Sequence, residues 1–529
     1  MWRLTLLFIP LLAACTASQH DENVLRFASM KDVRDLNPHL YGGEMPAQNM
    51  LFEGLVKNTP QGVAPALATS WDVSADGLTY VFHLRRGVSF SDGTPFDAAA
   101  VDANVKAVLA NRTRHAWLEL VNEIAEHRVV DDHTWALKLK RPYFPTLVEL
   151  GLIRPFRFLS PKCFKDGGTM SGTSCLSGTG PWMLAEHETN RYALFKPNPN
   201  YWGEKPRLAG VRWNVIPDAQ TLLMSLQKGD VDLVFGADGD QLSANAFASL
   251  AKEGKFVTQL SAPTASRAIL LNSARGALQD ARVREAIQYA VNRNDLVEHL
   301  LSGSESPAEK LFADNVPYVG DVGVKVRAFD PERAAALLDE AGWTLSPEGL
   351  RMKDRKPLTL VFSYNAQNVQ EKTIAQAVQS NLAKLGVTVR LLGEEKQAFL
   401  NRQRDGEFDM QYSLSWGAPY DPQSFFSSWR IPSHGDYQAQ SGLPDKATID
   451  REISDFLVAV DVKQRRALAA DIVKRVESAA VYLPISFART KVVHSVQVKD
   501  VGFGVSQYEI PFYAMCLEGH CKRDADRSR

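Results

Sequence analysis

The stretch LRRGVSFSDGTPF, residues 84–96, decides the fold that we expect. It continues the alternating run LTYVFHL at residues 78–84, which is typical of a β-strand with one buried face. Its glycines and proline favour turns, and residues 90–96 predict a second short strand and turn. Asp97 then has the type and position of an N-cap for a helix over residues 98–109. The segment therefore predicts a strand, a turn region and a helix in succession.

The rest of the chain alternates between the two kinds of element. Further helices are expected at residues 219–228, 281–290, 331–341, 369–385 and 465–478, and strands at residues 210–216, 358–363 and 387–392. This alternation indicates α/β domains with mixed sheets. The length of 529 residues, with 45% hydrophobic side chains, suggests two to four domains with large cores. A formal charge of −1 argues against nucleic acid or an anionic membrane surface as the main partner.

The amino terminus reads MWRLTLLFIPLLAAC, residues 1–15. A positive residue precedes an apolar stretch of about ten residues, which is too short for a bilayer core that needs about twenty. Small residues then precede Cys15, the order of a bacterial lipoprotein signal peptide. We expect cleavage before Cys15, lipid on that residue, and a body tethered outside the cytoplasm. An ordinary secretory signal whose cleavage site contains a cysteine is the alternative.

The other cysteines agree with an oxidising compartment. There are four of them: Cys163, Cys175, Cys516 and Cys521. Four cysteines allow three pairings, of which the local one, Cys163–Cys175 and Cys516–Cys521, is the most economical. A zinc site that uses Cys516, His520 and Cys521 is disfavoured, because these residues lack the C-x2-C spacing. We therefore predict two disulfides.

Several runs resemble the extracytoplasmic solute-binding proteins of oligopeptide, dipeptide and nickel ABC importers, known as family 5. They are residues 84–96, GTGPW at 178–182, NPNYW at 198–202, REAIQYAV at 284–291 and AGW at 341–343. The resemblance implies an α/β, two-lobed, type II periplasmic-binding-protein fold with an extra subdomain. It implies the following division: lobe I at residues 21–262 and 488–521, with the inserted subdomain at about 64–178; lobe II at residues 263–487; and a disordered tail at residues 522–529.

Other runs resemble the nickel-binding members of this family in particular. They are NRTRHAWLEL at residues 111–120, RPFRF at 154–158, WGAPYDP at 416–422 and PSH at 432–434. The resemblance implies a ligand in which a metal is already complexed by a small carboxylate-bearing molecule, such as histidine or a metallophore. The histidines fit this view because they are scattered, with no pair at i, i+4 and no HExxH. A chelate that arrives complete needs few ligands from the protein, and nickel accepts imidazole nitrogen and carboxylate oxygen.

By this resemblance, the chelate-binding side chains are Arg114, Arg154, Trp117, Trp416, Tyr420, Tyr41 and Met45, and the metal ligand is His434. The two guanidinium groups can each form paired hydrogen bonds to a carboxylate. The indole rings can close over the chelate, and Tyr420 can donate one hydrogen bond. Without the resemblance, Arg154 would read as an ordinary ion pair, Trp117 as core, and His434 as a solvated loop residue.

The first functional hypothesis is therefore a non-enzymatic, monomeric receptor. It captures a nickel(II) chelate and presents it to the ABC permease subunits, while the lipid on Cys15 is its only membrane attachment and its only covalent group. A receptor for peptides or another small solute is the alternative, although the cationic and aromatic set disfavours an amine-bearing ligand. An enzyme such as a hydrolase is a third hypothesis, but the sequence has no G-x-S-x-G and no zinc-protease motif. The sequence does not identify the chelator or rank nickel against cobalt, copper or iron.

Overall fold

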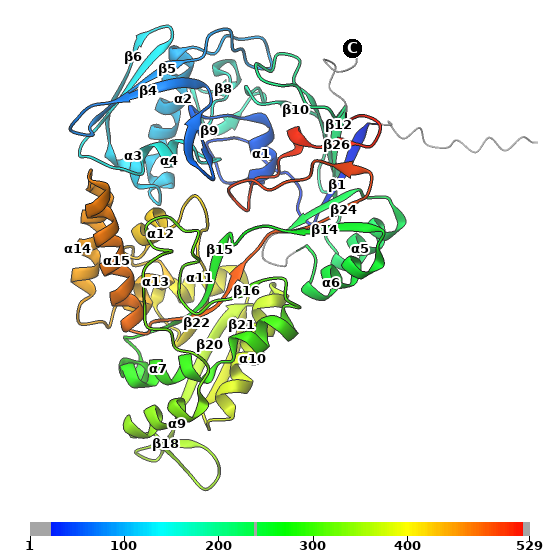
Figure 1. The fold of residues 1–529 in the computed structure, drawn as a ribbon. Helices are drawn as coiled ribbons and strands as arrows, with labels where there is room; N and C mark the ends of the chain where they lie inside the picture. Colours follow the sequence, from blue (N-terminus) through cyan, green and yellow to red (C-terminus); the bar gives the residue numbers. More distant parts are fainter. Residues whose placement is uncertain (1–22, 237–240, 522–529) are drawn as a thin grey trace, which may run out of the picture.

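The computed structural model describes residues 23–236 and 241–521, which fold into two lobes built on separate sheets (Figure 1). The predicted signal peptide with Cys15 and the predicted tail at residues 522–529 lie outside the described residues. Within the described ranges, no helix has the length and apolar character needed to cross a bilayer.

The first lobe is built on a seven-stranded mixed sheet. Its order is β10 (Trp182–Glu188), β11 (Tyr192–Pro197), β12 (Gly210–Val215), β1 (Val24–Ser29), β13 (Leu233–Gly236), β24 (Lys491–Ser495) and β14 (Phe256–Leu260). Strand β1 pairs in parallel with both β12 and β13, from Val24 opposite Gly210 to Ser29 opposite Val215. The lobe also holds the helices α1 (Met45–Leu51), α5 (Ala219–Lys228) and α6 (Ala244–Glu253), and the hairpins β2 (Val56–Thr59) with β3 (Gly62–Pro65) and β25 (Val498–Lys499) with β26 (Cys516–Leu517).

A four-stranded antiparallel sheet forms the region of the predicted subdomain. Its order is β4 (Ala68–Val73), β5 (Thr79–Leu84), β7 (Thr134–Leu139) and β6 (Ile124–Asp131), and it is accompanied by α2 (Ala98–Ala110), α3 (Glu119–Glu123), α4 (Thr146–Leu150) and the hairpin of β8 (Phe164–Lys165) with β9 (Gly168–Thr173). Asp97 caps α2 as predicted, because its Oδ1 accepts the amide proton of Ala100 at 2.8 Å.

The predicted short strand at residues 90–96 is wrong. This segment is a turn that a single bridge between Ser89 and Pro95 closes. Asp92 Oδ1 accepts a hydrogen bond from the Thr94 amide at 2.9 Å, so this backbone N–H has its partner within the turn. Phe90 and Phe96 both enter the core, with their ring centres 5.8 Å apart. The aromatic residues that suggested a strand therefore anchor a turn instead.

The second lobe is built on a six-stranded mixed sheet. Its order is β16 (Ser306–Pro307), β23 (Tyr482–Ala488), β15 (Ala265–Leu271), β22 (Met410–Leu414), β20 (Thr359–Asn365) and β21 (Thr388–Glu394). Its helices are α7 (Ala281–Ala290), α8 (Arg293–Asp295), α9 (Pro331–Glu340), α10 (Val369–Ala383), α11 (Lys396–Asp405), α12 (Gln423–Ser428), α13 (Gly435–Gln440), α14 (Lys446–Val458) and α15 (Val462–Ser478), and a small sheet joins β17 (Thr344–Leu345), β18 (Arg351–Lys353) and β19 (Lys356–Pro357).

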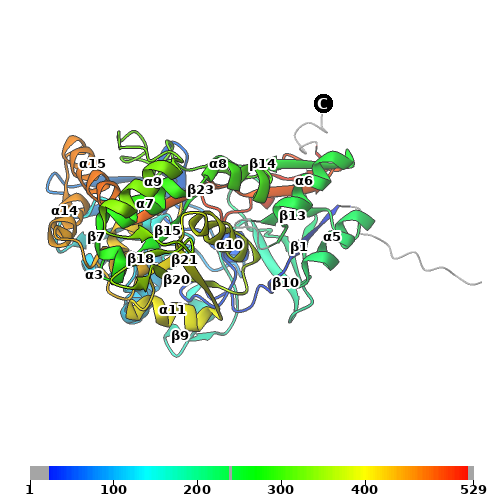
Figure 2. The same cartoon turned by 90° about the horizontal axis from the view of Figure 1, so that it is seen from below.

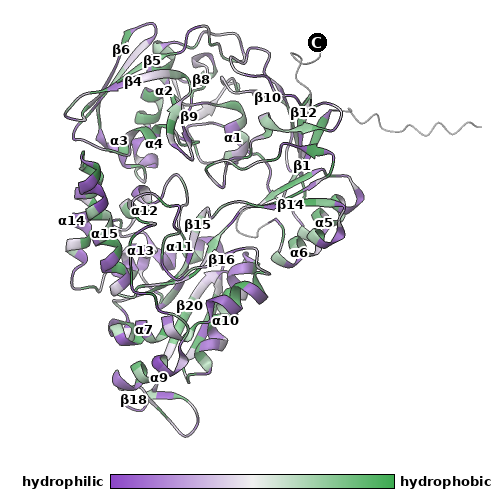
Figure 3. Cartoon of the chain, viewed as in Figure 1, coloured by the Kyte–Doolittle hydropathy of each residue, from purple (hydrophilic) through white to green (hydrophobic). Residues whose placement is uncertain are grey.

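Several helices of this lobe are amphipathic, and Figure 3 shows hydrophilic and hydrophobic stretches alternating along α14 and α15. In α10, the buried side chains include Ile374, Val378 and Leu382, which are spaced by four residues. This spacing forms an apolar stripe along one side of the helix, which packs against β20 and β21.

The chain passes between the two sheets twice. The first passage leads from β14 to β15 and the second from β23 to β24, and the bottom view shows β15 and β23, which pair with each other, near the middle of the molecule (Figure 2). Both passages are close to the predicted lobe boundaries at residues 262 and 488. We keep that predicted division to name the lobes. A further contact joins them at the edge, where the Phe144 amide donates to the Leu457 carbonyl at 3.2 Å.

Candidate ligand-binding site

A cavity of about 450 Å³ lies between the lobes. Its lining residues are Tyr41, Met45, Arg114, Trp117, Arg154, Leu414, Ser415, Trp416, Tyr420 and Tyr508. The cavity therefore brings together all seven of the side chains that we predicted to bind a chelate, although these come from segments hundreds of residues apart. Six of the lining residues belong to lobe I, and the four between Leu414 and Tyr420 belong to lobe II.

Short irregular segments position the lobe I residues. Tyr41 precedes α1, and Met45 is the first residue of that helix. Arg114 lies in a 3-10 turn, Arg112–His115, and Trp117 lies between this turn and α3. Binding residues are often on such irregular segments, which the regular elements on either side hold in place.

The lobe II residues follow the end of β22, where the chain turns at Gly417. This glycine has φ +76°, and a Cβ at this position would lie 2.2 Å from the carbonyl oxygen of Thr264. Only glycine therefore permits this conformation and this close approach to the passage between the lobes. The turn directs Trp416 and Tyr420 into the cavity.

Aromatic rings form the walls of the cavity. The rings of Trp117 and Trp416, from opposite lobes, are 5.6 Å apart at a steep angle. Tyr420 packs against both, at 6.4 Å from Trp117 and 6.3 Å from Trp416. Burial raises the pKa of Tyr420 well above its usual range, and its hydroxyl has no hydrogen-bond partner among the described residues. This hydroxyl is therefore available to a ligand.

Two guanidinium groups lie over the ring of Tyr41, that of Arg154 at 4.9 Å and that of Arg114 at 5.7 Å. Arg154 Nη1 donates to the Gly43 carbonyl at 3.2 Å and to Gln48 Oε1 at 3.4 Å. Burial lowers the pKa of Arg154. In the described part of the chain, no carboxylate forms an ion pair with Arg114 or Arg154. The cavity thus holds two positive charges without an acidic partner.

His434, the predicted metal ligand, lies beside the cavity and does not line it. Its ring centre is 6.0 Å from that of Trp416. The residue occupies the N-cap position of α13, but its side chain makes no capping hydrogen bond. Burial lowers the pKa of His434, so that its imidazole is neutral and can donate a lone pair at neutral pH. Elsewhere in the described residues, no group of three or more His, Cys, Asp or Glu side chains could hold a metal ion.

Sequence reasoning missed three lining residues, Leu414, Ser415 and Tyr508. Ser415 is fixed by its neighbours, since its Oγ donates to Asp421 Oδ2 at 2.5 Å and accepts from the Ser266 amide at 2.9 Å. Tyr508 comes from the return of the chain to lobe I after β24 and lies in no recognisable motif. Only the folded topology brings it to the cavity.

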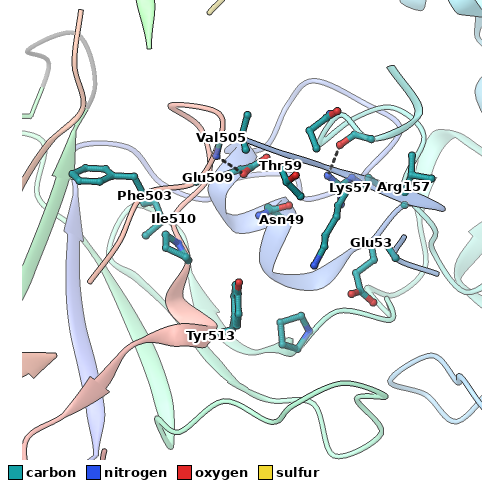
Figure 4. A pocket seen from close by; sticks show the side chains of 18 of the residues that line it. Asn49, Glu53, Lys57, Thr59, Arg157, Phe503, Val505, Glu509, Ile510 and Tyr513 are labelled. Atoms are coloured by element: carbon teal, nitrogen blue, oxygen red, sulfur yellow. Dashed lines mark hydrogen bonds between the residues drawn. The ribbon is translucent and has the colours of Figure 1, made fainter. Parts of the chain in front are cut away.

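A second cavity, of about 320 Å³, lies within lobe I (Figure 4). Its lining includes Glu53, Lys57, Arg157, Glu509 and Tyr513. Burial raises the pKa of both Glu53 and Glu509. Arg157 donates to three backbone carbonyls, those of Leu152, Phe52 and Gly151, so three of its five N–H groups are already used. This cavity has both acidic and basic side chains in its lining and lies within one lobe, whereas a receptor that closes on its ligand binds it between two lobes.

The four cysteines of the described body lie in two local pairs at disulfide distance. The Cα atoms of Cys163 and Cys175 are 4.8 Å apart, and those of Cys516 and Cys521 are 5.1 Å apart. These are the two local pairs that we predicted from the positions of the cysteines in the sequence. The pairing stays a prediction that a thiol measurement can test.

Comparison with known proteins agrees with this geometry. Residues 62–437 match the family described as bacterial extracellular solute-binding proteins, family 5 middle. The chain is 44% identical over 485 residues to the nickel-binding periplasmic protein of Escherichia coli (strain K12), which covers 91% of this chain and 92% of that protein. It is 27% identical to the dipeptide-binding protein of the same organism, over 79% of this chain and 81% of that protein.

Among solved structures, NikA from Brucella suis in complex with Fe(III)-EDTA is 45% identical, with a TM-score of 0.92 over 93% of this chain and 99% of that chain. The predicted two-lobed α/β fold is thereby confirmed, as is the predicted family. The chain belongs to the bacterial extracellular solute-binding proteins of family 5 and is a binding protein rather than an enzyme.

Proposed function

We propose that the protein is the extracytoplasmic receptor of an ABC importer for a metal chelate, with nickel(II) as the metal. It binds nickel as a complex with a small carboxylate-bearing chelator, such as histidine or a metallophore, and delivers the complex to the permease subunits. The name of the E. coli relative, a nickel-binding periplasmic protein, supports the metal. The B. suis relative holds Fe(III)-EDTA, which is a metal wrapped by a polycarboxylate.

The observation that carries this proposal is the pair of guanidinium groups without an acidic partner in an aromatic cavity between the lobes. Arg154 is partly buried and Arg114 is exposed, and a positive charge that a bound ligand would bury is costly unless an anion neutralises it. The carboxylates of a chelate meet this need with paired hydrogen bonds. The indole rings then cover the apolar faces of the same ligand.

His434 supplies the part of the proposal that concerns the metal. A neutral imidazole is a common ligand for nickel, and the ring centre of this side chain lies 6.0 Å from that of Trp416, which lines the cavity. A single imidazole leaves most coordination positions to the chelator. A chelate with an open position can use His434 after a small adjustment of the loop before α13, and a saturated chelate has no need of it.

The location follows from the same proposal. The lipid on Cys15 tethers the monomeric body outside the cytoplasm. The lobes close around the ligand, and the closed complex delivers it to the permease. Calorimetry on the purified body tests the function, with nickel–histidine, nickel–EDTA and a tripeptide as separate titrants. We expect both chelates to bind and the tripeptide not to bind. If the tripeptide bound more tightly than both chelates, the peptide-receptor alternative would replace this proposal.

A further inference from the structure

Tyr41 is held from two sides by residues of the segment that precedes α3. Trp117 Nε1 donates to the Tyr41 hydroxyl oxygen at 2.6 Å, and His115 Nδ1 lies 2.6 Å from the same oxygen. The His115 side chain is fully buried, whereas the Tyr41 ring faces the cavity. Sequence reasoning gave His115 no role, although it lies inside the run at residues 111–120 that suggested the ligand.

The protonation of His115 decides what the Tyr41 hydroxyl can offer to a ligand. Burial lowers the pKa of His115 to about 4, so the ring is neutral and carries one proton at neutral pH. If Nδ1 carries that proton, it donates to Tyr41. If Nε2 carries it, Nδ1 accepts the proton of the Tyr41 hydroxyl, which is then unavailable to the cavity.

The surroundings of the other ring nitrogen favour the first arrangement. His115 Nε2 is buried and has no hydrogen-bond partner in the described part of the chain. A buried N–H without an acceptor loses a strong hydrogen bond, and such groups are rare in folded proteins. A buried nitrogen lone pair without a donor costs less free energy than a buried N–H without an acceptor. In the same way, buried carbonyl oxygens are left without a partner more often than buried amide N–H groups.

We infer that His115 donates its Nδ1 proton to Tyr41, so that His115 and Trp117 together occupy both lone pairs of the phenolic oxygen and the hydroxyl proton of Tyr41 is directed at the ligand. Tyr41 then donates a hydrogen bond and accepts none from the ligand. His115 is a positioning residue that acts through Tyr41. The inference rests on the proposed function in one respect, because it assigns a carboxylate of the chelate as the acceptor.

This arrangement also distinguishes between ligand classes. An ammonium group has only donors, so it cannot bind an oxygen whose lone pairs are both occupied. The guanidinium groups over the Tyr41 ring repel an ammonium in addition. Burial raises the pKa of Tyr41 to about 12, so the hydroxyl keeps its proton at every physiological pH. The site is therefore built for an anionic oxygen at this point.

The tautomer can be read directly in the whole protein. Histidine labelled with 15N gives separate signals for a protonated and a bare imidazole nitrogen, and the His115→Asn variant identifies the signals of His115 by their loss. We expect a protonated Nδ1 and a bare Nε2 in the ligand-free protein. A protonated Nε2 would overturn the inference. Because this measurement needs no ligand, it stands whether or not the proposed function does.

A double-mutant cycle with nickel–EDTA as the probe tests the consequence for binding. Tyr41→Phe removes the hydroxyl and should weaken binding about tenfold, the usual effect of losing a hydrogen bond to a charged group. His115→Leu should weaken binding by a similar factor, and His115→Asn, whose amide can donate from the position of Nδ1, should recover most of this loss. The double variant with both Tyr41→Phe and His115→Leu should bind nickel–EDTA no more weakly than the Tyr41→Phe variant alone.

The cycle separates a positioning role from a merely structural one. If His115→Leu weakened the Tyr41→Phe protein as much as it weakens the parent, His115 would act by packing and the inference would be wrong. If the parent itself failed to bind nickel–EDTA and nickel–histidine, the proposed function would fall, while the tautomer measurement would still decide the state of Tyr41.

Discussion

The carboxylate of Glu119 in lobe I accepts a hydrogen bond from Arg430 Nη2 in lobe II at 2.5 Å. The same oxygen accepts from Ser427 Oγ at 2.9 Å, so two residues of lobe II converge on it. Within lobe I, Arg141 binds the other oxygen at 2.8 Å. Glu119 follows Trp117 by two residues, and Arg430 follows Tyr420 by ten. The pair thus joins the two lobes, and we expect it to favour the arrangement in which they are in contact.

The Glu119→Gln variant should bind every ligand more weakly by one common factor, of about three- to tenfold, since a partly exposed ion pair contributes about 1 kcal/mol. The reason is that the change lowers the population of the closed form without touching the ligand. Calorimetry with nickel–histidine and nickel–EDTA measures the two factors. Glu340→Gln, which breaks the Arg333–Glu340 pair within lobe II, is the matched control. Unequal factors would mean that Glu119 acts on the ligand.

The two arginines and the histidine of the site should differ in their effects. Arg114→Ala or Arg154→Ala leaves a ligand carboxylate unpaired and should cost about 2–5 kcal/mol of binding free energy for any chelate. His434→Ala should weaken nickel–histidine and barely affect nickel–EDTA, because EDTA saturates the metal. Arg112→Ala, on the same 3-10 turn but outside the cavity lining, is the control for charge. Unchanged binding of both chelates by both arginine variants would contradict the anionic-ligand site.

Glu149 should make the folded protein less stable as the pH rises. Tyr143 donates to its carboxyl at 2.6 Å and the Leu120 amide at 3.1 Å, and burial raises its pKa from 4.5 to about 8. The folded state keeps a proton that the unfolded state releases above about pH 4.5, so stability falls between pH 4.5 and 8, by up to about 1.4 kcal/mol per pH unit. Glu149→Gln should flatten this slope in thermal unfolding, and the exposed Glu332→Gln should not. Equal slopes in parent and Glu149→Gln would show that Glu149 is already ionised when folded.

The two cysteine pairs should leave no free thiol in the body of the protein. Titration of the denatured, non-reduced protein, produced without Cys15, should find almost no reactive thiol. The pairs close short loops, with sequence separations of 12 and 5, so each stabilises the fold by about 3 kcal/mol or less in the chain-entropy model. Four reactive thiols, or zinc released on denaturation, would refute the pairing.

Cys15 is the predicted acylation site, and its thiol is the group that we expect to carry the lipid. Cys15→Ser should therefore abolish the incorporation of labelled palmitate and leave the protein unprocessed or released. Binding of nickel–EDTA by the isolated body should stay the same, because the tether is remote from the cavity. Palmitate that still entered the Cys15→Ser protein would sink the lipoprotein assignment.

The regular elements could be predicted well from the sequence where residue periodicity and end signals point to one kind of element. Helices α5 and α7 have the predicted bounds, and α10 ends two residues early because the chain turns towards Gly386 at φ +79°. The error at residues 90–96 arose because buried aromatic residues are common to strands and to anchored turns. A strand and an anchored turn can be distinguished only from the surrounding core, which no local sequence pattern describes.

The cavity residues could be predicted only through resemblance. Arg154 and Trp117 have no local feature that distinguishes them from a residue in an ordinary ion pair or in the core. Their role depends on which residues lie opposite them in the folded protein. His115 and Glu119 lay in the run that was singled out, yet their roles depend on contacts with Tyr41 and Arg430, which are far apart in sequence. Tyr508 was missed for the same reason. Long-range pairing is the information that a single sequence lacks.

Under the proposed function, the division of the cavity between the lobes gives capture and retention of the ligand to different halves of the molecule. Arg114, Arg154 and Tyr41 all belong to lobe I, so the charge that attracts an anion is in place before the lobes meet. We therefore expect the rate of association to depend mainly on lobe I and to fall as the ionic strength rises. We expect Trp416 and Tyr420 of lobe II to cover the ligand afterwards, and the residence time to depend on how often this lobe moves away from lobe I.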